Sequence, residues 1–364
     1  CISPDRADSV FVAARPAGRR SHVSYYASTA VMAATQRPTA EERAAYTAMF
    51  VAEGYCVVRG LFSAEEVQTI SDAFDRLLST GVGTICADRK QRENVSQQLR
   101  EKWRPNDASG NSLNRSRASI TAASGATFAL SPRTDLRPEQ QQDAVDNPRP
   151  ELLATHLISQ CGKQEPVLAE LGRDPRLLTL AADVLDQQAL AAAGEHSLYQ
   201  IINQAHFKAP RDGVDFPWHQ DSINRGYHTG RFADVHGNRS YVNIAVAIDP
   251  ETAENGPLSV FAGSHKRGHL QTSSDPRQGQ FDWDFPREAG LSELTRVTPL
   301  LQPGDAIAFG MYVVHGSRSN TDSSRWRRAF INGFAWPSAV DPGSPEQQDE
   351  TNLRRIPATS VASL

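Results

Sequence analysis

The second half of the chain is a series of short apolar runs separated by turn residues, and this feature constrains the fold most. Each run is rich in Val, Ile, Phe or Tyr and is bounded by Gly, Pro, Asn or Asp, a pattern that indicates β-strands. The runs cover residues 198–208, 216–221, 241–248, 258–261, 297–301, 306–314 and 328–336. Many short strands joined by such turns predict an all-β barrel or jelly roll.

The first half carries helix signals instead. Thr39 with Glu42, and Ser63 with Glu66, have the spacing of a capping box, in which an N-cap hydroxyl and a Glu three residues later satisfy each other's backbone N–H. Four apolar residues spaced by three or four follow Ser63 and form one helical stripe. Further helices are expected at 165–171 and 175–191, and one strand at 54–60. Helices followed by strands predict a mainly β domain with a packed helical layer.

Residues 88–150 are the least ordered part by composition. Arg, Gln, Asn, Ser and Asp dominate, and five prolines interrupt the segment. Such a long stretch inside a compact domain is typical of a functional lid or of disorder. We favour an insertion that partly covers the site, within which the less polar residues 119–130 order against the body.

The two ends of the chain are expected to lie outside the folded domain. Residues 1–38 are interpreted as a disordered or non-native segment: a transit sequence, an upstream translated stretch or foreign residues, with Met32 as an alternative start. The domain is expected at 39–338, followed by a tail at 339–364.

Charge and cysteine usage narrow the functional classes. The 38 Lys and Arg residues nearly balance the 42 Asp and Glu residues, giving a net charge of −4. This balance provides no basic field for nucleic acid or an anionic membrane, and the sequence has no apolar run of 18 residues. The four cysteines form no CxxC pair, so reduced thiols in the cytoplasm are expected. Small-molecule chemistry is the expected activity, and the oligomeric state stays open.

One short stretch carries candidate metal ligands. His219 and Asp221 stand two positions apart, so on an extended strand both side chains project from one face. His315, at the end of a later apolar run, supplies a second imidazole. Two histidines and one carboxylate with open coordination positions suit a non-haem Fe(II) oxygenase. The alternatives are a surface HxD turn and a strand-end histidine satisfied within the fold.

Several motifs in the same order resemble the phytanoyl-CoA dioxygenase family of Fe(II)/2-oxoglutarate oxygenases. The resemblance covers residues 45–337 except 88–150. Its motifs are EGYCVVRGLF at 53–62, PWHQD at 217–221, NGPL at 255–258, GSH at 263–265, QPGDA at 302–306, HGS at 315–317 and RRA at 327–329. It implies a double-stranded β-helix, a jelly roll with helices on one sheet, and Fe(II) held by His219, Asp221 and His315.

The resemblance also implies the residues that bind the cosubstrate. Arg327 would hold the far carboxylate of 2-oxoglutarate, with Arg328 as the competing assignment because alternate strand residues face opposite ways. Ser317 would share that contact. Gln220 would lie on the cosubstrate side, and Asn243 would line the pocket on the next strand.

The implied activity is hydroxylation of a small metabolite, with Fe(II), 2-oxoglutarate and O₂ as cofactor and cosubstrates and with succinate and CO₂ released. Desaturation or cyclisation stays open, and the presence of Asp221 predicts oxygenation rather than halogenation. The alternative is a non-catalytic metal- and carboxylate-binding β-barrel, or a cupin-type enzyme that does not use 2-oxoglutarate. The strand 198–208 also carries His206 and Lys208, for which solvation on the outer face is favoured slightly over substrate contact.

Overall fold

The structure is a computed structural model, and it describes residues 38–103, 117–194, 197–211, 213–224, 232–270, 290–340 and 354–357. The segment 1–38, expected to be disordered or non-native, lies outside the described residues except for Pro38. Of the expected tail at 339–364, the described part includes a strand at Arg354–Pro357 that pairs with the main sheet.

Helices dominate the first half, as predicted. They are α1 (Ala40–Glu53), α2 (Ala64–Arg76), α3 (Gly83–Ala87), α4 (Arg89–Lys102), α5 (Pro138–Asp146), α6 (Pro166–Leu171), α7 (Pro175–Val184), α8 (Gln187–Ala192) and α9 (Asp221–Asn224). A π-helical turn at Leu77–Val82 continues α2. Both capping boxes are present and are confirmed. The helix expected at 175–191 is two helices, because Asp186 adopts a left-handed φ of 65° and caps α8 with its carboxylate.

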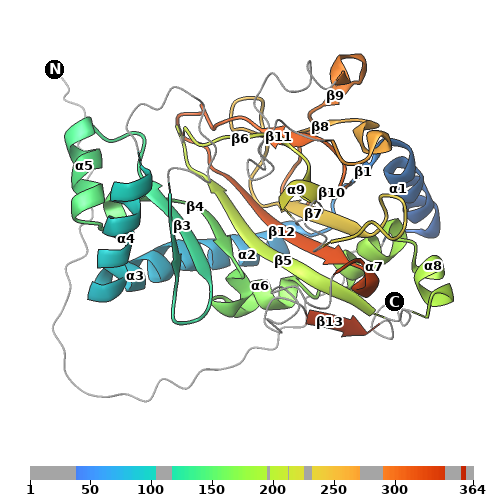
Figure 1. Cartoon of the computed structure of the whole chain (residues 1–364), viewed down its shortest axis with the longest axis horizontal. Coiled ribbons are helices and arrows are strands. Elements are labelled where there is room, and N and C mark those ends of the chain that lie inside the picture. The colour runs from blue at the N-terminus through green and yellow to red at the C-terminus, as the bar shows by residue number, and fades with distance from the viewer. Residues whose placement is uncertain are drawn as a thin grey trace, which may run out of the picture. The chain divides into compact units, whose positions relative to one another are not determined.

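The strands form two antiparallel sheets (Figure 1). The large sheet has the order β1 (Tyr55–Val58), β10 (Ala306–Gly310), β7 (Tyr241–Ala247), β12 (Arg327–Ala335), β5 (Ser197–Lys208), β4 (Leu153–Ser159), β3 (Thr127–Pro132) and β2 (Ala118–Thr121), and β13 (Arg354–Pro357) also pairs with β5. The small sheet has the order β6 (Phe216–His219), β11 (His315–Ser317), β8 (Leu258–Phe261) and β9 (Arg296–Val297). A strand is found in each predicted region, but β9 shares only Val297 with the run expected at 297–301, and β10 ends at Gly310 rather than at 314.

Two of the three apolar clusters among the described residues hold the helices and the sheets together. One core joins the helices to the outer face of the large sheet and contains Phe50, Phe74, Leu177 and Phe330, each fully buried. A second lies between the sheets, because its members come from both: Ala245, Ile307 and Phe309 from the large sheet and Val260 from the small one. The space between the sheets is therefore filled mainly by apolar side chains.

The polar segment 88–150 is more regular than its composition predicts. Its described part contains α4, β2, β3 and α5, and β3 pairs with β4 to extend the large sheet. The expectation of little regular structure was wrong because few apolar residues suffice: α4 buries only Val95, Ser96 and Leu99 and exposes most of its polar side chains. Residues 104–116 lie outside the described part of the chain.

Two further expectations can be compared with the described residues. Within them, no helix combines the length and the apolar character needed to cross a membrane. Cys56, Cys86 and Cys161 are free, buried thiols, and burial raises the pKa of each.

Candidate active site

The three predicted ligands converge between neighbouring strands of the small sheet. His219 ends β6 and lies directly opposite His315, the first residue of β11. Asp221 is the first residue of α9, so the strand expected over 216–221 ends two residues earlier than predicted. One potential ligand atom from each of the three residues lies within 4.8 Å of the others. The Nε2 of His315 lies 3.8 Å from Oδ1 of Asp221.

Backbone carbonyls orient both imidazoles. The Nδ1 of His219 lies 2.7 Å from the carbonyl oxygen of Pro217, and the Nδ1 of His315 lies 2.9 Å from that of Val313. Each Nδ1 must carry a proton to donate this bond, which leaves Nε2 with a lone pair for a metal. Burial, followed by the nearby His315, lowers the pKa of His219 to about 4. Its imidazole is therefore neutral at neutral pH, the form that can bind a metal.

The second oxygen of Asp221 is held by two side chains of β7. The hydroxyl of Tyr241 donates to Oδ2 at 3.1 Å, and Nδ2 of Asn243 donates to the same atom at 2.7 Å. Asn243 was expected to line the pocket and contact the cosubstrate. The structure places its amide on the Asp221 carboxylate, and a contact with the cosubstrate stays a prediction.

This donor set fits a ferrous ion. Two imidazole nitrogens and one carboxylate oxygen face one another, and all three side chains are buried. Fe(II) accepts this mixture of ligands, and three protein ligands leave room for others in an octahedral shell. Hydrogen bonds from outside the ligand set to all three residues are typical of a metal site.

The neighbouring arginines 327 and 328 point to opposite sides of the large sheet. Arg327 is buried and donates from Nε to Oε1 of Glu251 at 3.0 Å. Arg328 pairs with Asp249 and reaches Asp75 of α2 on the helical side. Alternation along β12 therefore brings Arg327, and not Arg328, into the interior.

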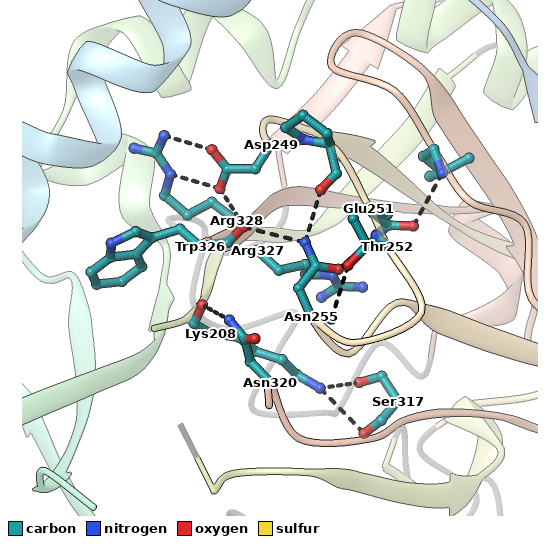
Figure 2. Close-up of polar contacts among 12 residues, drawn as sticks. Lys208, Asp249, Glu251, Thr252, Asn255, Ser317, Asn320, Trp326, Arg327 and Arg328 are labelled. Atoms are coloured by element: carbon teal, nitrogen blue, oxygen red, sulfur yellow. Dashed lines mark hydrogen bonds and ion pairs between the residues drawn. The ribbon is translucent and has the colours of Figure 1, made fainter. Parts of the chain in front are cut away.

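Ser317 and Lys208 lie together beside this arginine (Figure 2). The Nζ of Lys208 donates to Oγ of Ser317 at 2.8 Å, and also to the carbonyl oxygens of Ser317 and Arg318. Lys208 pairs with Arg327 across β5 and β12 and is 1% exposed. The preference for outer-face solvation was thus wrong for Lys208. The available signal was its place at the end of an apolar strand next to the HxD motif.

Comparison with known families agrees with this geometry. A family model described as phytanoyl-CoA dioxygenase (PhyH) matches residues 50–329, well over half of the chain. The chain belongs to the phytanoyl-CoA dioxygenase family.

The regions in which this chain matches curated relatives cover only part of each protein. The L-proline trans-4-hydroxylase of Streptomyces griseoviridis is 30% identical over 188 residues, which are 47% of this chain and 64% of the relative. The ectoine dioxygenase of Sphingopyxis alaskensis is 27% identical over 179 residues, which are 46% of this chain and 54% of the relative. The matched part is thus less than two thirds of either relative's length.

A solved structure establishes the fold of this family member. The crystal structure of EctD from S. alaskensis with 2-oxoglutarate and 5-hydroxyectoine covers 82% of this chain and 78% of that chain, with a TM-score of 0.52 and 22% identity. Together with the two facing antiparallel sheets, this likeness confirms the predicted double-stranded β-helix.

The side-chain amide of Gln220 is fully hydrogen-bonded within the fold. Its Nε2 donates to the carbonyl oxygens of Gly268 and Tyr312, and its Oε1 accepts from the N–H of Leu270. The side chain is fully buried. These bonds tie the loop at 268–270 to Tyr312, just after β10, and the contact of Gln220 with the cosubstrate stays a prediction.

Positive charge surrounds the inner face of β5. Burial, and then the charges of Arg327, Arg117 and Lys208, lower the pKa of His206 to about 3. The His206 ring stacks near Phe216, with centroids 5.5 Å apart, and lies 3.0 Å from Oε1 of Gln204. The imidazole of His206 is therefore neutral at neutral pH, and the positive charge near it comes from Arg327, Arg117 and Lys208.

Removing the hydrogen bonds on Asp221 should weaken metal binding. We expect Asn243→Ala to lower Fe(II) affinity by roughly 10- to 100-fold, the usual cost of losing an outer-shell partner. Tyr241→Phe, which keeps the ring packing and removes only the longer bond, should have the smaller effect. Equilibrium dialysis of Fe(II) under anaerobic conditions measures both. Equal affinities in both variants and the wild type would contradict the role given to these bonds.

Proposed function

We propose that this protein is an Fe(II)- and 2-oxoglutarate-dependent oxygenase that hydroxylates a small molecule. The observation that carries the proposal is the convergence of His219, Asp221 and His315 inside the double-stranded β-helix. The buried Arg327 pairs with Lys208, which bonds Ser317 on the strand that begins with His315. Membership of the phytanoyl-CoA dioxygenase family supports the proposal.

The residues of the chain would hold and orient the reacting groups. A bound ferrous ion with 2-oxoglutarate and O₂ supplies the oxidising chemistry, with release of succinate and CO₂. His219, Asp221 and His315 would hold the ion, and the hydrogen bonds described above fix their orientation before any ligand arrives. Burial of all three limits access of water to the site.

Arg327, Lys208 and Ser317 would bind the far carboxylate of 2-oxoglutarate. Arginine suits this role because its planar fork donates two parallel bonds to a carboxylate. Lys208 ends β5, the neighbour of β12, and Ser317 ends β11 of the small sheet; the ammonium and the hydroxyl lie 2.8 Å apart. Low exposure strengthens the attraction between these cations and an anion.

We infer a small polar metabolite as the substrate. The names of the two curated relatives specify L-proline and ectoine as the compounds on which those proteins act. The chain has no marked basic cluster of the kind that a coenzyme A phosphate would need. The carboxylate of Asp221 in the metal-binding set favours oxygenation over halogenation.

Succinate formation tests this proposal. Purified protein with Fe(II), 2-oxoglutarate and O₂ should release succinate in a substrate-dependent way across a library of amino acids and related small zwitterions. Under anaerobic conditions, Fe(II) with 2-oxoglutarate should give a weak visible charge-transfer band. A bound metal without this band and without succinate would favour the alternative, a metal-binding barrel that does not use 2-oxoglutarate.

A further inference from the structure

We propose that Glu251 is a positioning residue that sets the Arg327 guanidinium to receive 2-oxoglutarate. This inference rests on the function proposed above. Glu251 follows β7 in the loop that precedes the NGPL stretch, a place where the sequence gives no sign of a functional role. Its contact with Arg327 depends on the pairing of β7 with β12.

The ion pair between Glu251 and Arg327 leaves the two terminal nitrogens of the guanidinium available to a ligand. Arg327 donates to Glu251 through Nε alone, and its two terminal nitrogens donate no hydrogen bond within the described part of the chain. Arg328 differs, because both its Nε and its Nη2 are occupied by Asp249. The terminal nitrogens are the edge with which a guanidinium grips a carboxylate in parallel. Glu251 therefore holds Arg327 through Nε, and the terminal nitrogens can bind a ligand carboxylate.

Glu251 is itself rigidly held. Its backbone N–H donates to the carbonyl oxygen of Leu301 at 2.8 Å, and its Oε2 accepts from the N–H of Leu301. Asn255, fully buried, closes the loop through bonds to Thr252 and Pro250 (Figure 2). A carboxylate anchored on both sides can fix the arginine in one orientation, so less side-chain entropy is lost when the ligand binds.

The charges of Glu251, Arg327 and Lys208 also favour binding of an anion at Arg327. Burial raises the pKa of Glu251, while the charges of Arg327 and Lys208 act to lower it. The two cations and one carboxylate leave one net positive charge among these three buried side chains. A ligand carboxylate would add a negative charge beside the two buried cations, where an opposite charge is favourable.

Glycine at position 256 keeps this arrangement open. Its φ is +75°, and a Cβ there would lie 2.3 Å from the carbonyl oxygen of Arg318 and 3.1 Å from Nζ of Lys208. A side chain at 256 would therefore displace the lysine that accompanies Arg327. The loop that carries Glu251 thus also leaves space for Lys208.

Binding of 2-oxoglutarate to Glu251 variants tests the proposal. Calorimetric titration of the anaerobic Fe(II) protein should show roughly 10-fold or weaker binding for Glu251→Ala, because hydrogen bonds to charged groups typically contribute about 1.5–3 kcal/mol. Glu251→Gln keeps an acceptor for Nε and should bind within about threefold of the wild type. Asp249→Ala is the matched control, since it removes the partner of Arg328: it should lower Tm and leave 2-oxoglutarate affinity unchanged.

The combination Glu251→Ala with Arg327→Ala separates positioning from general destabilisation. If Glu251 acts through Arg327, the double variant should bind 2-oxoglutarate as weakly as Arg327→Ala alone. Tighter binding by Glu251→Ala would mean that Glu251 competes with the ligand, and equal loss in Asp249→Ala would mean a purely structural effect; either result overturns the proposal. A wild-type protein that does not bind 2-oxoglutarate would refute the proposed function itself.

Discussion

Asp221→Ala is expected to abolish 2-oxoglutarate turnover and to lower Fe(II) affinity by more than about 100-fold. The reason is that the carboxylate is the only anionic member of the ligand set among the described residues. Losing an outer-shell partner already costs roughly 10- to 100-fold, and loss of a ligand removes both a donor atom and the charge that balances the ion. Anaerobic Fe(II) dialysis and succinate release measure the two effects.

A matched control for this variant is Asp72→Ala on the exposed face of α2. It removes the same side chain at a site remote in sequence and should keep wild-type metal affinity and turnover. Because Asp221 also accepts bonds from Tyr241 and Asn243, circular dichroism should verify that the variant is folded. Full turnover by a folded Asp221→Ala protein would refute the metal centre.

Arg327→Ala is expected to weaken 2-oxoglutarate binding by about 100-fold or more. Truncating one member of a buried charge pair costs about 2–5 kcal/mol, and 1.4 kcal/mol corresponds to about a tenfold change in affinity. The variant removes the fork for the far carboxylate and leaves Glu251 buried without its cation. The Kd for 2-oxoglutarate, from calorimetry or from the anaerobic charge-transfer band, measures the loss, and Fe(II) affinity should change far less.

Arg328→Ala separates binding from stability at the adjacent position. Arg328 contacts Asp249, Asp75 and Ser71 on the helical side of the sheet, so its removal should lower Tm and keep 2-oxoglutarate affinity. The reverse pattern, with affinity lost only in Arg328→Ala, would reassign the cosubstrate arginine to position 328.

Local patterns predicted the elements that depend on local physics. The capping boxes at Thr39 and Ser63 depend on atoms three residues apart, so residue types suffice to find them. The strand expected at 198–208 is present at Ser197–Lys208, because alternating and apolar runs reflect burial of one face or both. The two histidines and the aspartate were recognisable because few other combinations of residue types suit ferrous iron.

Residues whose roles depend on strand pairing were predicted less well. The residue types of Gln220 and Asn243 did not show that their amides bond to backbone groups and to Asp221, respectively. Lys208 looked like a solvated strand end, yet it is buried opposite Arg327. The segment 88–150 looked irregular because α4 packs through only three buried residues, Val95, Ser96 and Leu99, and its other positions are polar.

The sequence by itself determined which side chains could bind iron, and that helices precede a set of short strands, since both follow from residue type and local spacing. Only the tertiary structure decided that His219 lies opposite His315, that Arg327 rather than Arg328 faces inward, and that Glu251 holds it. Those facts depend on strand register, and a shift by one residue would turn each side chain to the opposite face.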